Sequence, residues 1–545
     1  MASDRHVSLA VTSDLWWKNA VVYCLDVETF QDSDGDGIGD FRGVTERIDH
    51  LAGLGVSCVW LMPFYPTPDL DDGYDVTDYY GVDARYGSLG DFVEFVRTAR
   101  DRGLRVIADF LVNHTSDRHP WFEAARADRR STYRAFYVWA DEPPKDGPTD
   151  LVFPGAEDSM WHYDERAGQY FLHRFYHHQP DLNAANPRVR QEIAKAMGFW
   201  LELGLAGFRI DAVPYFVEEL GAHGQTTGKD SHEYLRDLHA FVSRRDGDAV
   251  LVGEVNLPPD ELGGFFGDDE GEKLDMLFDF IGNQALYLAL VRESAEPLAR
   301  ALTALPALEE QHQWARFVRN HDELTLDKLS DEEREEVFAA FAPEEDMRIF
   351  DRGIRRRLPS MLGGDRRRLE LVYSLLLALP GTPVLLYGEE IGMGDNLAAT
   401  GRMSVRTPMQ WTDEAAGGFS TAATDDLCVP MADGERGPER VNVAAQEHDP
   451  QSLLNWMTRV VRLRRETPEI GFGERKPVEV DDKAVLAYRC DWRGRSVACV
   501  HNLGGDSAAV RLDGFEELVD LFSGRRTSAD VELEPYGYRW FRAAG

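Results

Sequence analysis

The chain of 545 residues is too long for one compact core and suits a large domain with smaller ones attached to it. A hydrophobic content of 43% with 12 tryptophans excludes an intrinsically disordered chain. The 59 basic and 96 acidic residues give a formal charge of −37, which argues against nucleic acid or an anionic membrane as a partner but leaves neutral ligands open.

The cysteines and the N-terminal segment indicate a protein of the cytoplasm. Five cysteines are few and odd in number, and Cys24 and Cys58 lie in apolar runs, where a free thiol behaves as a small hydrophobe. No cysteine and histidine residues have the spacing of a zinc site. The first 14 residues contain no apolar signal sequence, and no stretch has the length of a membrane span. We therefore expect no membrane partner.

Eight short apolar runs alternate with amphipathic stretches, a pattern that predicts an α/β fold with the eight strands of a (β/α)8 TIM barrel. A helix is expected at 44–54 and another at 453–465. The predicted strands are 20–27, 56–63, 104–112, 207–213, 249–255, 274–280, 314–320 and 382–388.

Two segments interrupt this alternation, and the end of the chain departs from it. Residues 115–178 are rich in aromatic residues and proline and predict a small domain inserted after strand three. At about 325–365 the many charges lie at helical spacing, which predicts a solvated helical insert. The predicted barrel therefore has two parts, 1–114 and 179–470, and the short alternating runs at 471–545 predict a C-terminal β domain.

Three acidic residues end three of the apolar runs. The runs are GFRIDA at 207–212, AVLVGE at 249–254 and ARFVRNHD at 315–322, and the acids are Asp211, Glu254 and Asp322. A (β/α)8 barrel builds its site at the carboxyl ends of its strands, so we expect these side chains on one face. Paired carboxylates are the groups that cleave glycosidic bonds.

The surroundings of each acid suggest its role. Arg209 and Asp211 are two residues apart on a strand and share a face, so the guanidinium should lower the pKa of Asp211 and keep it ionised as a nucleophile. Repulsion from neighbouring carboxylates should raise the pKa of Glu254, which suits a proton donor. Asp322 would stabilise positive charge in the transition state.

These motifs, together with DFLVNH at 109–114, resemble the alpha-amylase family, glycoside hydrolase family 13, from about residue 16 to the C-terminus. The resemblance implies a barrel with an inserted domain after strand three and a C-terminal β-sandwich. It also assigns the nucleophile to Asp211, the acid/base to Glu254 and the transition-state stabiliser to Asp322. His114 and His321 are suited to hydrogen-bond sugar hydroxyls.

Two further motifs narrow the predicted substrate. DDGYDVTDYYGV at 71–82 and VRTPMQW at 405–411 resemble the exo-acting alpha-glucosidase and trehalose synthase branch of this family. The resemblance implies that Asp75 pairs with Arg406 and grips the non-reducing glucose, and that Tyr74 offers that sugar an aromatic face. The alternative is that Asp75 and Arg406 form a purely structural salt bridge.

An Asp-rich loop predicts a metal site. Residues 32–40 place oxygen ligands at alternate positions, as in the first nine residues of an EF-hand loop, but position twelve is Gly43 instead of glutamate. Ca2+ is the expected ion, with Mg2+ as the second choice, and an ordinary surface turn is the alternative. The expected ligands are Asp32, Asp34, Asp36, the carbonyl of Ile38 and Asp40.

A second calcium site is implied only by the resemblance to trehalose synthases. In that branch an ion lies where the barrel meets the inserted domain. The matching residues here are Asn113, Asp181, Tyr215, Phe216 and Glu218, with Tyr215 and Phe216 acting through their backbone carbonyls. The alternative is that Asn113 merely orders the loop after strand three.

The trehalose synthase branch, the maltose alpha-D-glucosyltransferases, is the nearest resemblance, carried by segments such as QYFLHRFYHHQPDLN and GIRRRLPSML. It implies isomerisation of maltose to trehalose through a glucosyl–Asp211 intermediate, with some hydrolysis to glucose. The segments CLDVETF at 24–30, GEVNLP at 253–258 and GRMS at 401–404 depart from the branch. They keep open an exo-acting alpha-glucosidase that hydrolyses short alpha-glucosides.

The expected partner is a small sugar such as maltose, trehalose or a short alpha-glucoside, with no organic cofactor. A non-catalytic sugar-binding relative is disfavoured because all three acids are present. The sequence leaves open whether the chain forms a homo-oligomer.

Overall fold

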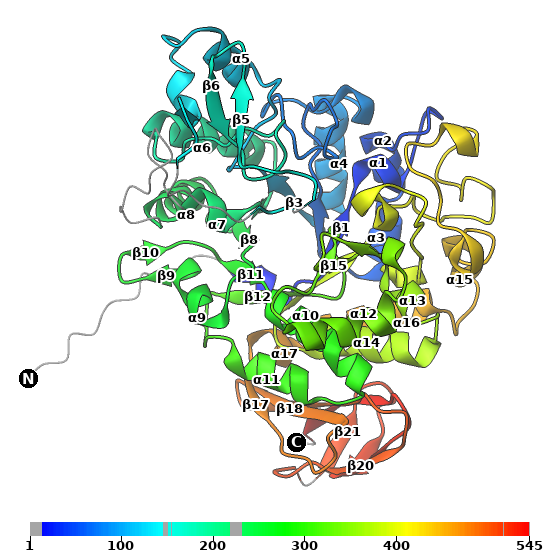
Figure 1. Ribbon diagram of the computed structural model, residues 1–545. Coiled ribbons are helices and arrows are strands. Elements are labelled where there is room, and N and C mark those ends of the chain that lie inside the picture. The colour runs from blue at the N-terminus through cyan, green and yellow to red at the C-terminus, as the bar shows by residue number, and fades with distance from the viewer. Residues whose placement is uncertain (1–13, 145–150, 154, 218–231, 516, 544–545) are drawn as a thin grey trace, which may run out of the picture.

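Eight parallel strands close into a barrel in the computed structural model, which describes residues 14–144, 151–153, 155–217, 232–515 and 517–543 (Figure 1). All eight predicted strands are confirmed, and each pairs with its neighbours in the sequence order that a (β/α)8 barrel requires. The barrel strands are β1 (Val22–Leu25), β2 (Cys58–Leu61), β3 (Arg105–Phe110), β7 (Gly207–Ile210), β8 (Val250–Gly253), β11 (Met276–Phe278), β12 (Gln313–Phe317) and β16 (Thr382–Leu386).

Helices surround the barrel (Figure 1). In α4 (Leu89–Asp101) the buried residues Phe92, Phe95, Val96 and Ala99 recur at helical spacing, and the Ser88 hydroxyl caps the first turn. The expected helix at 44–54 is split at Arg47 into two helices, whereas the one at 453–465 is confirmed. The other large helices are α2 (Phe41–Glu46), α3 (Ile48–Leu54), α6 (Pro187–Glu202), α8 (Glu233–Arg245), α10 (Phe280–Arg292), α11 (Glu296–Ala304), α14 (Arg366–Ala378) and α16 (Leu453–Arg465).

Between β3 and β7 the chain forms a small antiparallel sheet above the barrel (Figure 1). Helix α5 (Pro120–Ala127) begins this segment, and the sheet has β6 (Gln169–Leu172) between β4 (Trp139–Ala140) and β5 (Trp161–Asp164). Aromatic rings fill the space under it, for example Phe122 stacked on Trp139 with centroids 5.4 Å apart. The aromatic content of the sequence here therefore builds a core.

The charged segment between β12 and β16 is only partly helical, which corrects the expectation of a helical insert. It contains helix α12 (Asp331–Phe341) and the short α13 (Leu358–Met361). Between them a hairpin of β14 (Arg348–Ile349) and β15 (Gly353–Ile354) joins β13 (Leu324–Thr325) in a three-stranded sheet. The helical spacing of charges was thus informative only up to about residue 341, where the α12 helix ends.

The C-terminal residues form a β domain of two antiparallel sheets, shown in orange and red in Figure 1. Alternating residues such as Val485, Ala498 and Val531 point between the sheets and form a separate apolar core. The larger sheet has the order β17 (Glu474–Pro477), β18 (Val485–Trp492), β19 (Arg495–Asn502), β24 (Tyr538–Ala543), β21 (Glu517–Asp520) and β22 (Arg526–Ser528). The smaller sheet pairs β20 (Ala508–Arg511) with β23 (Asp530–Leu533).

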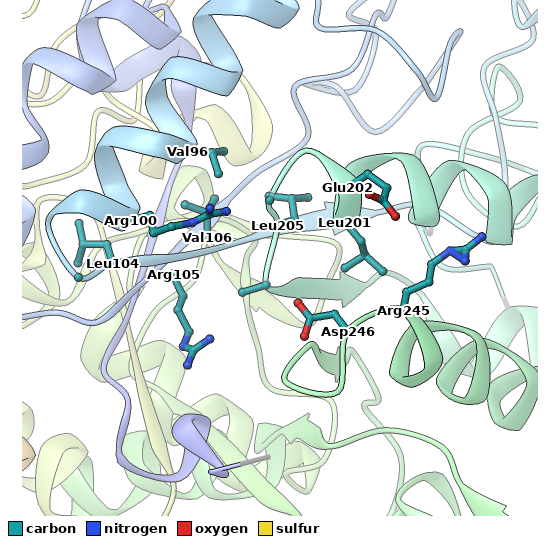
Figure 2. Close-up of a pocket in the computed structure, with 13 residues that line it drawn as sticks. Val96, Arg100, Leu104, Arg105, Val106, Leu201, Glu202, Leu205, Arg245 and Asp246 are labelled. Atoms are coloured by element: carbon teal, nitrogen blue, oxygen red, sulfur yellow. The ribbon is translucent and has the colours of Figure 1, made fainter. Parts of the chain in front are cut away.

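A cavity of about 590 Å³ lies where β3 and β7 begin, shown in Figure 2. Arg100 from α4, Arg105 at the start of β3 and Asp246 after α8 line it, with an apolar floor that includes Leu205. Parallel strands carry their functional side chains at the opposite, carboxyl ends, so this cavity is remote from the predicted acids. Among the described helices, none combines the length and apolarity that a membrane span requires.

Candidate active site

The barrel brings the three predicted acids together at the carboxyl ends of its strands. Asp211 directly follows β7 and Glu254 directly follows β8, and the two strands are paired so that Ile210 lies opposite Gly253. Asp322 follows β12 after a short loop. Glu254 keeps a quarter of its side-chain surface exposed, whereas the Asp211 side chain is 10% exposed. A ligand can therefore approach Glu254 while Asp211 lies deeper.

Arg209 connects the carboxylates of this site. Its Nη1 lies 2.5 Å from Asp109 Oδ1 and 2.6 Å from Asp211 Oδ1, and its Nη2 lies 2.8 Å from Glu254 Oε2. The guanidinium itself is buried, so these charge-assisted bonds fix its orientation. Because one guanidinium holds both Asp211 and Glu254, the two carboxyl groups are close together, as a double-displacement mechanism at a sugar requires.

The surroundings of Asp211 correct one sequence expectation. Burial raises the pKa of Asp211 to about 6, and although Arg209 acts to lower it, the burial and the nearby charges of Asp109 and Asp322 outweigh that effect. The prediction that Arg209 brings this pKa below its ordinary value is therefore wrong in its net direction. Asp211 is still mostly ionised above pH 6, so it can attack as a carboxylate.

Glu254 has the environment of a proton donor. Burial raises the pKa of Glu254 to about 7, and the charges of Asp211 and Asp322 add to this, while Arg209 opposes it. The backbone N–H of Ala212 donates to Glu254 Oε2 at 3.2 Å. Ala212 has φ of 52°, a left-handed conformation that is unusual for alanine, and it turns that N–H toward Glu254 at the end of β7.

Asp322 remains ionised because two arginines face it. Arg402 Nη1 lies 3.1 Å and Arg406 Nη2 lies 3.2 Å from Asp322 Oδ1. Burial alone would raise the pKa of Asp322, but Arg402, His321 and Arg406 bring it well below its usual range. The three acids therefore differ in protonation: a permanent anion at Asp322, a nucleophile at Asp211 and a proton donor at Glu254.

The predicted sugar-binding residues around the acids form one hydrogen-bonded group. The Tyr74 hydroxyl lies 2.6 Å from His321 Nε2 and donates to Asp109 Oδ2 at 3.2 Å. His114 Nε2 lies 3.0 Å from the Tyr74 carbonyl. Burial lowers the pKa of His114 to about 4 and also lowers that of His321, so both rings are neutral and each has a single N–H. His114 donates its N–H to the Tyr74 carbonyl, so both buried rings position Tyr74, and their bonds to a sugar hydroxyl stay a prediction.

The predicted pair of Asp75 and Arg406 is wrong. Among the described residues, Arg406 pairs with Asp72 and Asp322 instead. Asp75 is buried and accepts bonds from the Thr67 hydroxyl at 2.7 Å and from the backbone N–H groups of Leu70 and Asp71, in the loop that precedes it. It organises the loop that presents Tyr74 and does not reach the arginine.

Sequence reasoning did not select three residues that complete the site. Asp109 is fully buried, binds Arg209 and accepts from Trp60 Nε1 at 3.0 Å. Asp72, rather than Asp75, binds Arg406, and Arg402 binds Asp322. Signals existed for each: Asp109 opens the motif that ends at His114, Asp72 lies in the same motif as Asp75, and Arg402 lies in the GRMS departure.

The Asp-rich loop folds into a compact carboxylate group. Among the described residues, ligand oxygens of Asp32, Asp34 and Asp40 lie within 4.8 Å of one another, a spacing that suits one cation. Asp36 is outside that group and accepts from the Ile38 N–H at 2.9 Å. Backbone and hydroxyl donors also bind Asp32 and Asp40, so the loop has internal partners in addition to its ligand geometry.

The residues of the second predicted metal site line one small cavity, except Glu218, which lies outside the described residues. Asn113, Asp181, Tyr215 and Phe216 are all in its lining. Arg174 enters the same cavity, where its guanidinium donates to the Tyr215 carbonyl and its Nε lies 3.6 Å from Asp181 Oδ2. A cation here would compete with Arg174 for the same oxygens, so the fit is weaker than at the Asp-rich loop.

A closed (β/α)8 barrel with a buried nucleophile, a partly exposed carboxylic acid and an arginine-held carboxylate defines a retaining glycoside-acting enzyme. The chain belongs to the alpha-amylase family, glycoside hydrolase family 13. The family model for the alpha amylase catalytic domain matches residues 26–341 and 350–473.

Similar proteins narrow the position within the family. The trehalose synthase of Pimelobacter sp. is 41% identical over 97% of this chain and 96% of its own length. The trehalose synthase of Thermus thermophilus is 42% identical over 97% of this chain, which spans 55% of that longer protein. The crystal structure of trehalulose synthase from Pseudomonas mesoacidophila matches 97% of this chain and 99% of its own with a TM-score of 0.79 and 27% identity.

Proposed function

We propose that the protein isomerises maltose to trehalose through a covalent glucosyl ester on Asp211, with some hydrolysis to glucose. Sugar isomerisation by an alpha-amylase family enzyme is supported by relatives named trehalose synthase at 41 and 42% identity. The observation that carries the mechanism is the shared guanidinium of Arg209, which holds a nucleophile and a proton donor side by side.

The first step cleaves maltose. Glu254, protonated near neutral pH, gives its proton to the glycosidic oxygen while Asp211 attacks the anomeric carbon, which forms the ester and releases glucose. The charge that develops on the ring is stabilised by ionised Asp322. Arg406, which pairs with both Asp72 and Asp322, would bind the hydroxyls of the sugar that stays on the enzyme.

The second step decides the product. Released glucose must turn so that its anomeric hydroxyl faces the ester, and Glu254, now a carboxylate, removes the proton of that hydroxyl as it attacks. The second inversion restores the alpha configuration and gives trehalose. If water attacks first, the product is a second glucose. Isomerisation therefore requires that glucose remain beside Asp211 while water is kept away.

An exo-acting alpha-glucosidase is the second candidate. Glucosidases are also among the relatives, for example glucan 1,6-alpha-glucosidase of Streptococcus pneumoniae at 30% identity over 92% of this chain. The quarter of the Glu254 side chain that is exposed gives water a route to the ester. The lower identity of these relatives favours the isomerase.

A time course with maltose distinguishes the two candidates. We expect trehalose as the main product and free glucose as a minor one, measured by separating the sugars at intervals. Adding isotopically labelled glucose shows whether the acceptor is the glucose released in place, because an enclosed acceptor leaves little label in trehalose. Glucose formed without trehalose at any time would refute the isomerase and support the glucosidase.

We also propose that the Asp-rich loop binds Ca2+, with Mg2+ as the second choice. Asp32, Asp34 and Asp40 would hold the ion, since their oxygens lie within 4.8 Å of one another, a spacing that suits one cation. The ion would have a structural role there, because the loop connects the short helix α1 (Val27–Phe30) to α2, outside the group of catalytic acids. The second site, at Asn113 and Asp181, stays a prediction.

A further inference from the structure

The tip of the β14–β15 hairpin has an unusual backbone. Phe350 and Asp351 have φ of 55° and 57°, so two consecutive residues with side chains adopt the left-handed conformation that such turns normally give to asparagine and glycine. A bulky aromatic residue is disfavoured there, and strain of this kind persists only where neighbouring contacts hold it. The position of the Phe350 ring is therefore enforced by its surroundings.

The hairpin is fixed to the segment that carries Asp322. Its strand β15 pairs with β13, in which Leu324 lies opposite Ile354, and the Leu326 N–H donates to the Arg352 carbonyl at 2.8 Å. Gly353 packs so closely that an added Cβ would lie 2.6 Å from Glu323 Cγ. The hairpin is therefore bonded to, and closely packed on, the residues directly after Asp322.

The hairpin tip also contacts the inserted domain. Phe350 stacks on Phe153 with ring centroids 4.8 Å apart, and Phe153 stacks on Tyr176 at 4.7 Å. Beside the rings, Arg352 Nη2 donates to the Val152 carbonyl at 2.7 Å. These three rings, called the ring stack below, link segments that approach the site from different sides of the barrel.

Arg402 connects the ring stack to the catalytic acids. Its guanidinium lies 4.9 Å from the centroid of Phe153 and 5.6 Å from that of Phe350. The same group binds Asp322 at 3.1 Å and Glu323 at 2.8 Å. The ring stack is thus one side chain away from Asp322, and the side chain between them is Arg402.

We infer that Phe350, through the ring stack, closes the acceptor side of the site and sets how often the glucosyl–Asp211 ester reacts with retained glucose instead of water. Aromatic faces bind the C–H faces of a sugar and exclude water, which is what retention of glucose requires. This inference rests on the proposed isomerisation and adds a residue that controls its outcome.

The test compares product ratios in Phe350→Ala with those of the wild-type enzyme. We expect the ratio of glucose to trehalose from maltose to rise about tenfold, equivalent to about 1.4 kcal/mol between the two competing barriers. Labelled glucose should also enter the trehalose more readily, because an open acceptor side exchanges its sugar. Phe350→Tyr, which keeps the ring, should restore the wild-type ratio.

A matched control removes an aromatic ring elsewhere. Phe522 lies in the C-terminal domain, 38% exposed, and packs on Tyr538 and Trp540. Phe522→Ala should leave the ratio unchanged, which separates the specific effect from general loosening. If Phe350→Ala does not fold, Phe350→Leu keeps the apolar bulk without a ring and should shift the ratio in the same direction.

Failure of this inference can be told apart from failure of the proposed function. If the wild-type enzyme makes trehalose and the folded Phe350 variants give the same ratio and the same label uptake, the ring stack does not control the outcome. If the wild-type enzyme makes no trehalose, the isomerase proposal fails. The role of the ring stack is then tested with an aryl alpha-glucoside as donor and labelled glucose as acceptor. If Phe350→Ala has the same ratio of transfer to hydrolysis as the wild-type enzyme, the inference about the ring stack is wrong.

Discussion

Replacing Asp109 by asparagine should shift the acidic side of the pH profile to lower pH. The reaction needs Asp211 ionised, so activity falls as the pH drops through its pKa of about 6, and it needs Glu254 protonated, so activity also falls as the pH rises through about 7. The charge of Asp109 raises the pKa of Asp211. Asparagine has nearly the same shape but no charge, so Asp211 should stay ionised at lower pH.

The size of the shift follows from the shared nitrogen. Oxygens of Asp109 and Asp211 both bind Arg209 Nη1, at 2.5 and 2.6 Å. They are therefore at most about 5 Å apart, and two unit charges at that distance repel by about 3 kcal/mol at an effective dielectric constant of 20. Because one pKa unit corresponds to about 1.4 kcal/mol, this repulsion is equivalent to about two units when both groups are charged. Burial raises the pKa of Asp109 itself to about 6, so Asp109 is only partly charged over the acidic limb, and we expect a shift of about one unit.

The assay is kcat/KM on an aryl alpha-glucoside measured across pH for the wild-type and Asp109→Asn enzymes. The normalised shape of the profile carries the result, so a lower absolute rate does not affect it. The two limbs report the coupled pair of Asp211 and Glu254, and both are fitted together. An acidic limb that stays in place or moves to higher pH in a folded variant would refute the electrostatic reasoning.

Three further predictions concern the nucleophile, the metal loop and the corrected arginine partner. Asp211→Ala should reduce kcat on maltose by a factor on the order of 10^4 with an unchanged circular dichroism spectrum, and substantial residual activity would rule out a covalent ester there. A chelator should lower the melting temperature and Ca2+ should restore it, because Asp32, Asp34 and Asp40 repel one another without an ion; a metal-free protein with an unchanged melting temperature would exclude the site. Asp72→Ala should raise KM for maltose, because Arg406 loses one of its carboxylate partners. Asp75→Ala should mainly lower the melting temperature, since among the described residues Asp75 bonds only to its own loop. The reverse pattern would contradict the observed pairing.

The barrel could be predicted from the sequence because each of its strands is a short apolar run that can be recognised from its own residues. Each run has the length of a strand, and the acids that end two of them, Asp211 and Glu254, are fixed at the barrel rim by strand direction alone. The split of the expected helix at 44–54 was less accessible, because it depends on the cap at Arg47 and not on the hydrophobic pattern. The positions of these two acids at the barrel rim could therefore be predicted without knowing any contact between distant segments.

The errors in the site concern a contact between two loops and the burial of one acid. Asp72 and Asp75 lie in one motif with similar surroundings in sequence, and the backbone between them turns through Asp72 and Gly73, with φ of 48° and 86°, so that Asp72 faces Arg406. The net pKa of Asp211 could not be predicted either, since the sequence shows the neighbouring Arg209 but not the burial that outweighs it. Contacts between distant loops and the degree of desolvation are properties of the folded state.

The three sequence departures from the trehalose synthase branch lie at different parts of the site, which bears on the identity of the product. Asp26 and Glu28, from the departure at 24–30, place carboxylate oxygens within 4.8 Å of Asp72, beside Arg406 and the proposed binding end for the retained glucose. Asn256, from 253–258, bonds to Asp327, at 3.0 Å, beyond the strand that follows Asp322.

Only the GRMS departure reaches the ring stack, through Arg402. An altered first strand therefore acts on how a glucosyl unit is held, whereas the choice between glucose and water depends on Arg402 and the two rings that contact it. A change of product without a change of substrate would therefore have to arise at Arg402 and its two rings. At this position the chain has both an arginine bound to Asp322 and an aromatic residue, Phe350, held in a strained turn.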